Sequence, residues 1–292
     1  MKLVSYMYEG ETAVGIIGRD PDKLVSVQSL CYQSATMPEF IRELGGVIPE
    51  GLLDFVDRAG GVALSDCRLL APIKHPEQDV VCLGCNYMEH RREVDDKLQV
   101  NVDMQQMDTI YFSKRVNEAV DPGGIIDGHF DLVDSLDYEV ELAAVIGKDA
   151  YKVSRGEVQD YVLGYTILND VSARNLQSKH QQWYFGKSLD GFTPMGPWIV
   201  TADELGWKPE LEIRSYLNGA LRQSANTNMM MKQVDDVVAE LSQGMTLRAG
   251  TMIALGTPSG VGAAMEPKAF MKSGDVIRCE IEGIGVLENT IG

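Results

Sequence analysis

Three carboxylates in the middle of the chain have the residue types and the spacing to hold a metal ion. Glu139 and Glu141 alternate with apolar residues in the stretch 136–145, so a β-strand there places both side chains on one face. Two carboxylates this close repel each other at neutral pH unless a cation lies between them. For an isolated pair, a solvated strand face is the simpler interpretation, because water and salt screen the repulsion.

Asp170 favours the metal interpretation. It follows the apolar run 161–169, where a predicted strand ends and a predicted helical segment, 171–177, begins. Three carboxylates without a His or Cys cluster suit a hard cation that prefers oxygen ligands. The sequence therefore predicts a site for Mg²⁺, with Mn²⁺ or Ca²⁺ as alternatives. Asp137 lies on the same strand face, and we expect it to be solvated or to support the ligands from behind.

His90 and Glu93 are a second pair with chemical potential. They lie three residues apart in a polar, helix-like segment, 89–100, which has no apolar stripe. On a helix the two side chains share a face, so the carboxylate can orient the imidazole and raise its basicity. Taken alone, the pair is more typical of a histidine beside a glutamate on a charged helix surface.

The elements that position these residues divide the chain into two parts. Residues 2–27 predict three strands, with turns at Glu9-Gly10 and at 18–21. Segment 34–46 predicts a helix that Ser34 or Thr36 caps and Gly45-Gly46 ends, and 49–60 predicts a second helix. Segment 69–79 holds two prolines and little periodicity, which is typical of a linker.

After residue 80 the pattern becomes strand-dominated. Strands are predicted in 80–87, 137–147, 161–170, 197–201, 212–221, 251–262 and 275–291, and a helix in 234–244 that Gly244 closes. Many strands with long irregular connections indicate an all-β or α+β barrel-like body, and not a doubly wound sheet.

Composition limits the function classes. The 292 residues are 45% hydrophobic and carry a formal net charge of −17, which disfavours nucleic acid and anionic membranes as partners. No uncharged apolar run reaches the length of a membrane span, and the first residues do not form a signal peptide. The five cysteines are scattered, so we expect reduced thiols and a cytoplasmic protein. Cys82 and Cys85 form a C-x-x-C without a second pair, and small buried side chains are the favoured interpretation.

Five blocks, taken in order, resemble the fumarylacetoacetate hydrolase family: GCNYMEHRREV, DYEVELAAVIG, GYTILNDVSARNLQ, GKSLDGFTPMGPWIVT and LGTPSGVG. The resemblance implies a β-rich α+β protein. A mixed β-sandwich roll catalytic domain would span 78–292, and a small α+β N-terminal domain would span 1–72. It also implies a homodimer and a divalent metal, usually Mg²⁺, held by Glu139, Glu141 and Asp170.

The resemblance also assigns roles to residues that composition leaves undecided. His90 and Glu93 are similar to a lid dyad that activates water, and Lys187 to a cation that stabilises developing negative charge. The resemblance also predicts substrate contacts. They are Arg174 and Gln177 in the third block, Thr257 in the fifth block, and, more loosely matched, Asn226 and Thr227 in the segment SANTNMMM. Without the resemblance, Arg174 and Gln177 are a helix-surface pair and Lys187 is a solvated lysine.

A small 2-oxo acid is the implied substrate, because its carboxylate and keto oxygens can chelate a metal with open positions. The His90/Glu93 pair favours hydrolysis of an acylpyruvate to pyruvate and a carboxylic acid. Decarboxylation or isomerisation of an unsaturated 2-oxo or 2-hydroxy dicarboxylic acid is the alternative, since one site supports all three reactions. Segment 95–131 departs from the family: Lys114 is present in FSKRVNEA, but the usual following proline is absent. This departure leaves substrate size open.

Overall fold

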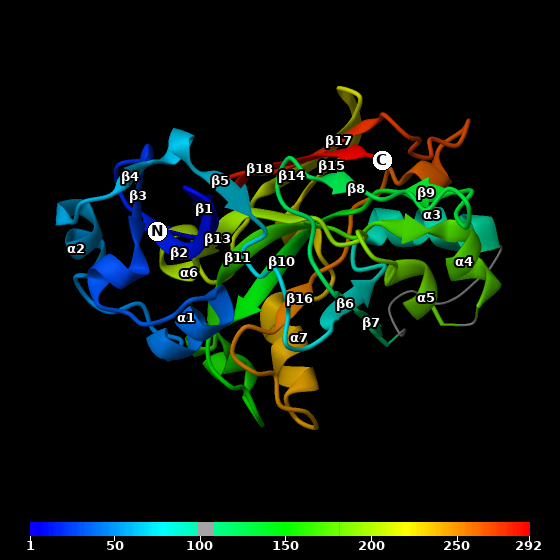
Figure 1. Ribbon diagram of the computed structural model, residues 1–292. Helices are drawn as coiled ribbons and strands as arrows, with labels where there is room; N and C mark the ends of the chain where they lie inside the picture. Colours follow the sequence, from blue (N-terminus) through cyan, green and yellow to red (C-terminus); the bar gives the residue numbers. More distant parts are fainter. Residues whose placement is uncertain (99–107, 181) are drawn as a thin grey trace.

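The computed structural model describes residues 1–98, 108–180 and 182–292. Two β-sheets dominate these residues, and short helices lie at the periphery (Figure 1). The predicted β-rich α+β class is confirmed. The part of segment 95–131 between residues 99 and 107 lies outside the described residues.

The larger sheet runs through the whole molecule. Its strand order is β4-β3-β2-β1-β13-β11-β10-β16-β6-β7, and β5 also pairs with β1. Its strands are β1 (Lys2–Tyr8), β2 (Glu11–Ile17), β3 (Lys23–Ser26), β4 (Val62–Ala63), β5 (Arg68–Leu70), β6 (Val80–Gly84), β7 (Ile110–Lys114), β10 (Val140–Ile146), β11 (Val162–Asn169), β13 (Met195–Thr201) and β16 (Met252–Ala254).

The second sheet has the order β15-β14-β17-β18-β8. Its strands are β8 (Ile125–Ile126), β14 (Glu212–Leu217), β15 (Ala220–Asn226), β17 (Val276–Ile281) and β18 (Gly285–Ile291). A short ribbon pairs β9 (Leu136–Asp137) with β12 (Ser172–Ala173). The α-helices are α1 (Met37–Leu44), α2 (Leu52–Arg58), α3 (Met88–Leu98), α4 (Arg174–Lys179), α5 (Tyr184–Lys187), α6 (Ala202–Leu205) and α7 (Val234–Leu241).

Strand β10 lies between two apolar cores, which explains its sequence. Val140, Leu142 and Ala144 belong to the core that also contains apolar side chains of the second sheet. Ala143 and Val145, on the opposite face, pack in the core shared with α1 and β1. The alternation predicted from the sequence is therefore real, although both faces of the strand are buried. The glutamates occupy the start of the face that ends in Ala143 and Val145.

The N-terminal segment is continuous with the rest of the larger sheet. β1 pairs antiparallel with β13, with Leu3 opposite Ile199. Thr36, one of the two predicted caps, forms a capping box with Glu39 at the start of α1, and Gly45 ends the helix in the left-handed region. The division into domains at 1–72 and 78–292 stays a prediction. The larger sheet and one apolar core both include residues from each of the two parts.

The local structure departs from the sequence pattern at several turns. Segment 212–221 holds a hairpin turn between β14 and β15, where Asn218 and Gly219 both have positive φ. Asn-Gly is a strong signal for such a turn, and the strand prediction overlooked it. The strand predicted over 251–262 ends at Ala254 in β16, and a loop follows it. The helix predicted over 171–177 begins only at Arg174, after β12. The predicted helix 234–244 ends at Leu241, before Gly244.

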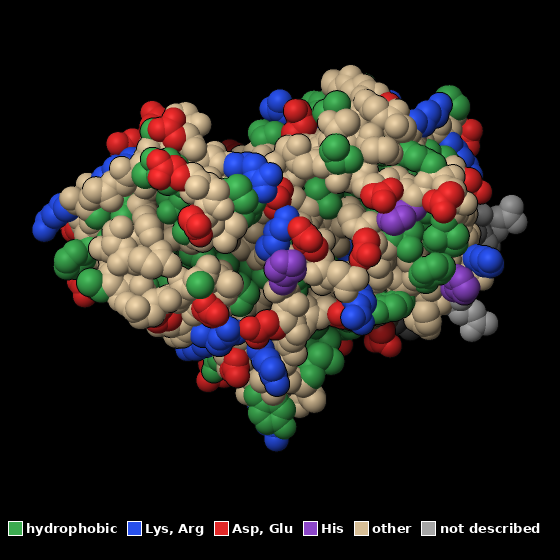
Figure 2. All heavy atoms as spheres, viewed as in Figure 1, with side chains coloured by type: hydrophobic (Ala, Val, Ile, Leu, Met, Phe, Trp, Pro, Cys, Tyr) green, Lys and Arg blue, Asp and Glu red, His purple; other side chains and the backbone are tan. Residues whose placement is uncertain are grey.

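Other global predictions can be compared with the described residues. None of their helices has the length and apolarity to cross a membrane. None of the five cysteines, all of which lie in described residues, forms a disulfide bond; Cys82 is buried in β6, whereas Cys85 is only half-buried. Figure 2 shows acidic side chains scattered over the visible face, with Lys and Arg among them.

Candidate active site

The carboxylate trio (Glu139, Glu141 and Asp170) is assembled by two neighbouring strands. β10 and β11 pair antiparallel with Val140 opposite Asn169, so the residues that flank this pair meet at the same end of the sheet. The N–H of Asp170 donates to the carbonyl of Glu139 at 2.8 Å. All three carboxylates are buried, and each offers an oxygen within 4.8 Å of the other two.

Two buried lysines lie against the trio. Lys187 donates to Glu139 at 2.7 Å and to Asp170 at 2.6 Å. Lys114, at the end of β7, donates to the second oxygen of Asp170 at 2.7 Å and to the carbonyl of Val171 at 3.0 Å. The sequence identified Lys187 but assigned Lys114 only to the approach of the site. Its direct contact with the trio depends on the pairing of β7 with β6, which no local pattern reveals.

The charges of the trio are only partly balanced by these cations. Burial raises the pKa of Glu141 well above its ordinary value, and the charges of Asp170 and Glu139 raise it further. Burial also raises the pKa of Glu139, but Lys187 and Arg174 outweigh it and leave that pKa below its ordinary value. Without another cation, the Glu141 carboxyl therefore favours its protonated form.

This preference of Glu141 for a bound positive charge fits a metal cation. The donor set consists of carboxylate oxygens alone, which is the set that hard divalent ions prefer. A positive charge among the three carboxylates would offset both the cost of burying Glu141 and the repulsion from Asp170 and Glu139, which together raise its pKa. Glu139, Glu141 and Asp170 would hold the ion, with Lys187 and Lys114 orienting the carboxylates through their hydrogen bonds.

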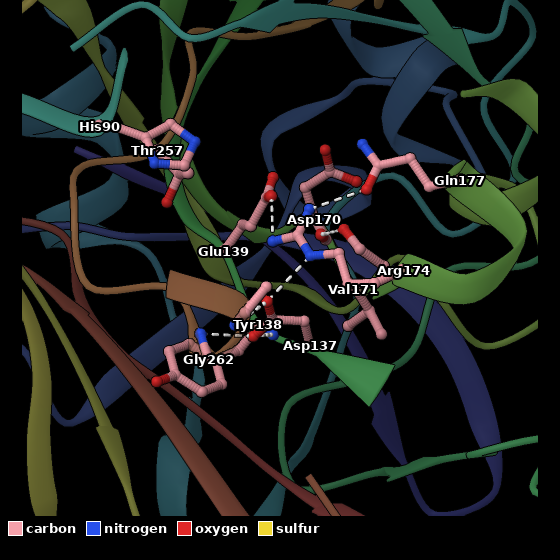
Figure 3. A network of polar contacts seen from close by, with 12 residues as sticks. His90, Asp137, Tyr138, Glu139, Asp170, Val171, Arg174, Gln177, Thr257 and Gly262 are labelled. Atoms are coloured by element: carbon pink, nitrogen blue, oxygen red, sulfur yellow. Dashed lines mark hydrogen bonds and ion pairs between the residues drawn. The ribbon is translucent and has the colours of Figure 1, made fainter. Parts of the chain in front are cut away.

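Helix α4 carries Arg174 and Gln177 on one face, as their spacing predicts, and Arg174 reaches the trio. The Arg174 guanidinium forms an ion pair with Glu139 at 2.7 Å and donates to Asp137 at 2.8 Å and to Gln177 at 3.0 Å. In Figure 3 these side chains lie on one side of Glu139, and His90 lies on the other. Arg174 thus already has carboxylate partners, and its predicted contact with substrate stays a prediction.

Asp137 supports the site from behind, and solvation, the other expectation for it, is excluded. It is fully buried. Besides Arg174, its carboxylate accepts hydrogen bonds from the backbone N–H groups of Gly262 at 2.7 Å and Ala263 at 2.9 Å (Figure 3). The Asp137 carboxylate therefore fixes the position of both Arg174 and the loop that follows Gly260.

Replacing Asp137 by alanine should lower the free energy of unfolding by about 3–5 kcal/mol, because Arg174 loses one of its two carboxylate partners. Two backbone N–H groups would also lose their acceptor. Urea unfolding of the variant checks this, with Asp160→Ala, an exposed aspartate, as the matched control. Equal stability of the two variants would contradict the role assigned to Asp137.

His90 and Glu93 form the predicted pair on α3. The Nδ1 atom of His90 lies 3.2 Å from Glu93, and Glu93 in turn accepts the backbone N–H of Gly260 at 3.0 Å. His90 is 6% exposed. Because a carboxylate accepts, Nδ1 is the donor, and Nε2 is left as the ring atom that can exchange a proton. The backbone contact at Gly260 fixes the carboxylate that orients the ring.

A cavity of about 720 Å³ joins the two halves of the site. Leu83, Val261 and Phe270 contribute to its apolar lining. The sequence-predicted residues that line it are His90, Glu93, Glu139, Glu141, Arg174, Gln177, Lys187 and Thr257. Asp170 completes the trio from beneath, with no exposed surface of its own.

Thr257 lines the cavity, but its hydroxyl is engaged within the protein. It donates to the carbonyl of Val140 at 2.9 Å and accepts from Gln223 at 2.7 Å. A hydroxyl has one hydrogen to donate, so this group cannot also donate to a substrate carboxylate. If Thr257 donates a hydrogen bond to substrate, the donor is therefore its backbone N–H.

The structure does not bring Asn226 and Thr227 to this cavity. Asn226 caps the turn that follows β15 and donates to Glu212 at 3.0 Å. The buried Thr227 hydroxyl donates to Pro209 and accepts the N–H of Leu211 at 2.8 Å. Both side chains hold a turn together, which corrects the expectation that this loop faces the substrate.

The sequence missed an aromatic wall of the cavity. Phe112 and Trp183 pack edge to face with ring centroids 5.2 Å apart, and the Lys187 ammonium lies 5.2 Å from the centre of the Phe112 ring. A Cβ atom on Gly84 would lie 2.7 Å from Trp183, so glycine permits this packing. Cys85 also lines the cavity, and the interpretation as a small buried side chain therefore describes only Cys82.

Comparisons with known proteins identify the family of the chain. The family model described as fumarylacetoacetate (FAA) hydrolase C-terminal matches residues 79–292. Oxaloacetate tautomerase YisK of Bacillus subtilis is 40% identical over 230 residues, which are 79% of this chain and 75% of that protein.

Among solved structures, the fumarylacetoacetate hydrolase from Exiguobacterium antarcticum has 36% identity and a TM-score of 0.85, covering 100% of this chain and 99% of its own. A 5-carboxymethyl-2-hydroxymuconate delta-isomerase from Mycobacterium smegmatis has 28% identity and a TM-score of 0.73, with the same coverage. The chain belongs to the fumarylacetoacetate hydrolase family.

Proposed function

We propose that this protein is a divalent-metal-dependent tautomerase that moves a proton between carbon and oxygen of a small 2-oxo acid such as oxaloacetate. The observation that carries the proposal is one cavity with the carboxylate trio and Lys187 on one side and the oriented His90 on the other. A divalent ion held by the trio would supply a Lewis acid for the enolate oxygen.

The protein's own groups would do the rest. Lys187 and Lys114 each pair with the Asp170 carboxylate and fix its position, so the ligands need no rearrangement during the reaction. His90 would take or return the proton at Nε2, while Glu93 holds the Nδ1–H and stabilises the imidazolium that forms. Keto–enol exchange needs only this one acid–base group, because the proton that it takes from carbon can be returned to oxygen, and the reverse.

The relatives support this choice among the reactions that one site can perform. One relative is named an oxaloacetate tautomerase, and one structural neighbour is named an isomerase. Hydrolysis of an acylpyruvate, which the sequence favours, is the second candidate. The same His90–Glu93 pair could activate a water, and a cavity of about 720 Å³ has room for an acyl group. The homodimer, the cytoplasmic location and Mg²⁺ as the natural ion stay predictions.

The test runs three assays of the Mg²⁺-treated protein in parallel, on two substrates. We expect it to accelerate the decay of enol absorbance in oxaloacetate, and we expect a chelator to remove the acceleration. Acetylpyruvate is assayed for pyruvate and acetate, and oxaloacetate for release of CO₂. Cleavage of acetylpyruvate without enol–keto exchange would assign the protein to the hydrolases, and CO₂ release alone would assign it to the decarboxylases.

A further inference from the structure

The cations that line the cavity are not equivalent. Arg174 and Lys187 are each held by two carboxylates of the site. Lys268 also lines the cavity, but no ion pair joins it to another described residue. Its ammonium lies 5.8 Å from the centre of the Phe270 ring, another lining residue. Arg174, Lys187 and Lys268 are the lysine and arginine residues that line the described part of the cavity. Of these three, Lys268 is the one without a carboxylate partner among the described residues, so its charge can interact with a ligand.

The backbone that carries Lys268 is fixed relative to the trio. The loop begins at Gly262, whose N–H donates to Asp137, and Asp137 pairs with Arg174. It closes where the N–H of Ala269 donates to the carbonyl of Gly262 at 3.0 Å. Met271 then pairs with β9 through Leu136. These contacts hold the loop at one place on the cavity wall, although the Lys268 side chain itself is exposed.

We propose that Lys268 binds a second carboxylate of the substrate, at the end of the molecule away from the reacting carbonyl. This inference rests on the proposed function, in which the trio takes the 2-oxo acid end. A protein with a net charge of −17 repels a dianion unless a local cation receives it. Asp134 also lines the cavity and disfavours an anion beside it, so the second carboxylate belongs at the Lys268 wall.

The experiment compares diacids with mono-acids of equal chain length in the Mg²⁺-treated protein. The pairs are oxaloacetate and 2-oxobutyrate, 2-oxoglutarate and 2-oxopentanoate, and 2-oxoadipate and 2-oxohexanoate. Calorimetry gives Kd for each. We expect wild type to prefer at least one diacid by about tenfold, the effect of one charged hydrogen bond. Lys268→Ala should abolish that preference, Lys268→Arg should keep most of it, and Lys268→Glu should reverse it.

Lys272→Ala is the matched control, because Lys272 is exposed, lies four positions further along, and is outside the cavity lining. A preference that Lys272→Ala lowers as much as Lys268→Ala would reflect overall charge and overturn the assignment. A diacid preference that survives in Lys268→Ala would overturn it as well, and would leave the proposed function standing. If wild type binds none of these acids, the proposed function and the assignment fall together.

Discussion

Replacing Asp170 by alanine should abolish the reaction and weaken divalent-metal binding by more than about a hundredfold, which is the upper range for loss of a group that merely supports a ligand. Asp170 is one of three carboxylates that face one another, and it is the partner of both Lys114 and Lys187. The free energy of unfolding should also fall by about 3–5 kcal/mol, because Lys114 keeps its buried charge without a carboxylate.

Calorimetric titration with Mg²⁺, the enol–keto assay and urea unfolding measure the three effects. Asp170→Asn keeps the volume and separates loss of charge from loss of packing; we expect it to lose metal binding as the alanine variant does. Asp160→Ala serves again as the exposed control. If the Asp170→Ala variant binds metal within about twofold of the wild-type affinity, Asp170 is not a metal ligand, because loss of even a supporting group usually costs more than that.

Replacing His90 by alanine should lower kcat by about 10²–10⁴-fold, the usual contribution of a positioned acid–base group. Metal affinity should change little, because no hydrogen bond or ion pair joins His90 to the trio in the described structure. Glu93→Gln should have a smaller effect on kcat, since the amide can still accept the Nδ1–H but no longer stabilises a charged ring.

The assay is the rate of enol–keto exchange at saturating substrate, with metal affinity measured on the same preparations. His75→Ala is the matched control, because His75 is outside the cavity lining and contacts a backbone carbonyl at Asn117. If His90→Ala keeps the wild-type kcat, the proton is carried by another group, and Lys187 becomes the candidate to replace next. Simultaneous loss of metal binding would instead show that His90 acts on the trio.

The trio could be predicted because its signals are local. Period-two alternation places Glu139 and Glu141 on one face, and the end of an apolar run marks Asp170. The residues around it could not be placed in this way. Lys114 contacts Asp170 across 56 positions of sequence. Asp137 contacts Gly262 across 125 positions, and only strand pairing and loop packing decide such contacts.

The mistaken assignment of Asn226 and Thr227 has a related cause. A short polar segment after a strand is typical both of a substrate loop and of a structural turn. The two differ only in what the side chains meet. Here they meet Glu212 and the backbone of 209–211, and the Thr227 hydroxyl both donates and accepts a hydrogen bond within the protein.

The pairing of β1 with β13 has a consequence for how this chain can be shortened. The region that matches the family model begins at residue 79, yet the strand that covers the edge of β13 lies at residues 2–8. A chain trimmed to that region would leave β13 with an open row of backbone hydrogen-bonding groups and uncover the apolar side chains of Ile199 and Leu168. Such a fragment would self-associate through that edge, even with every residue of the candidate site intact.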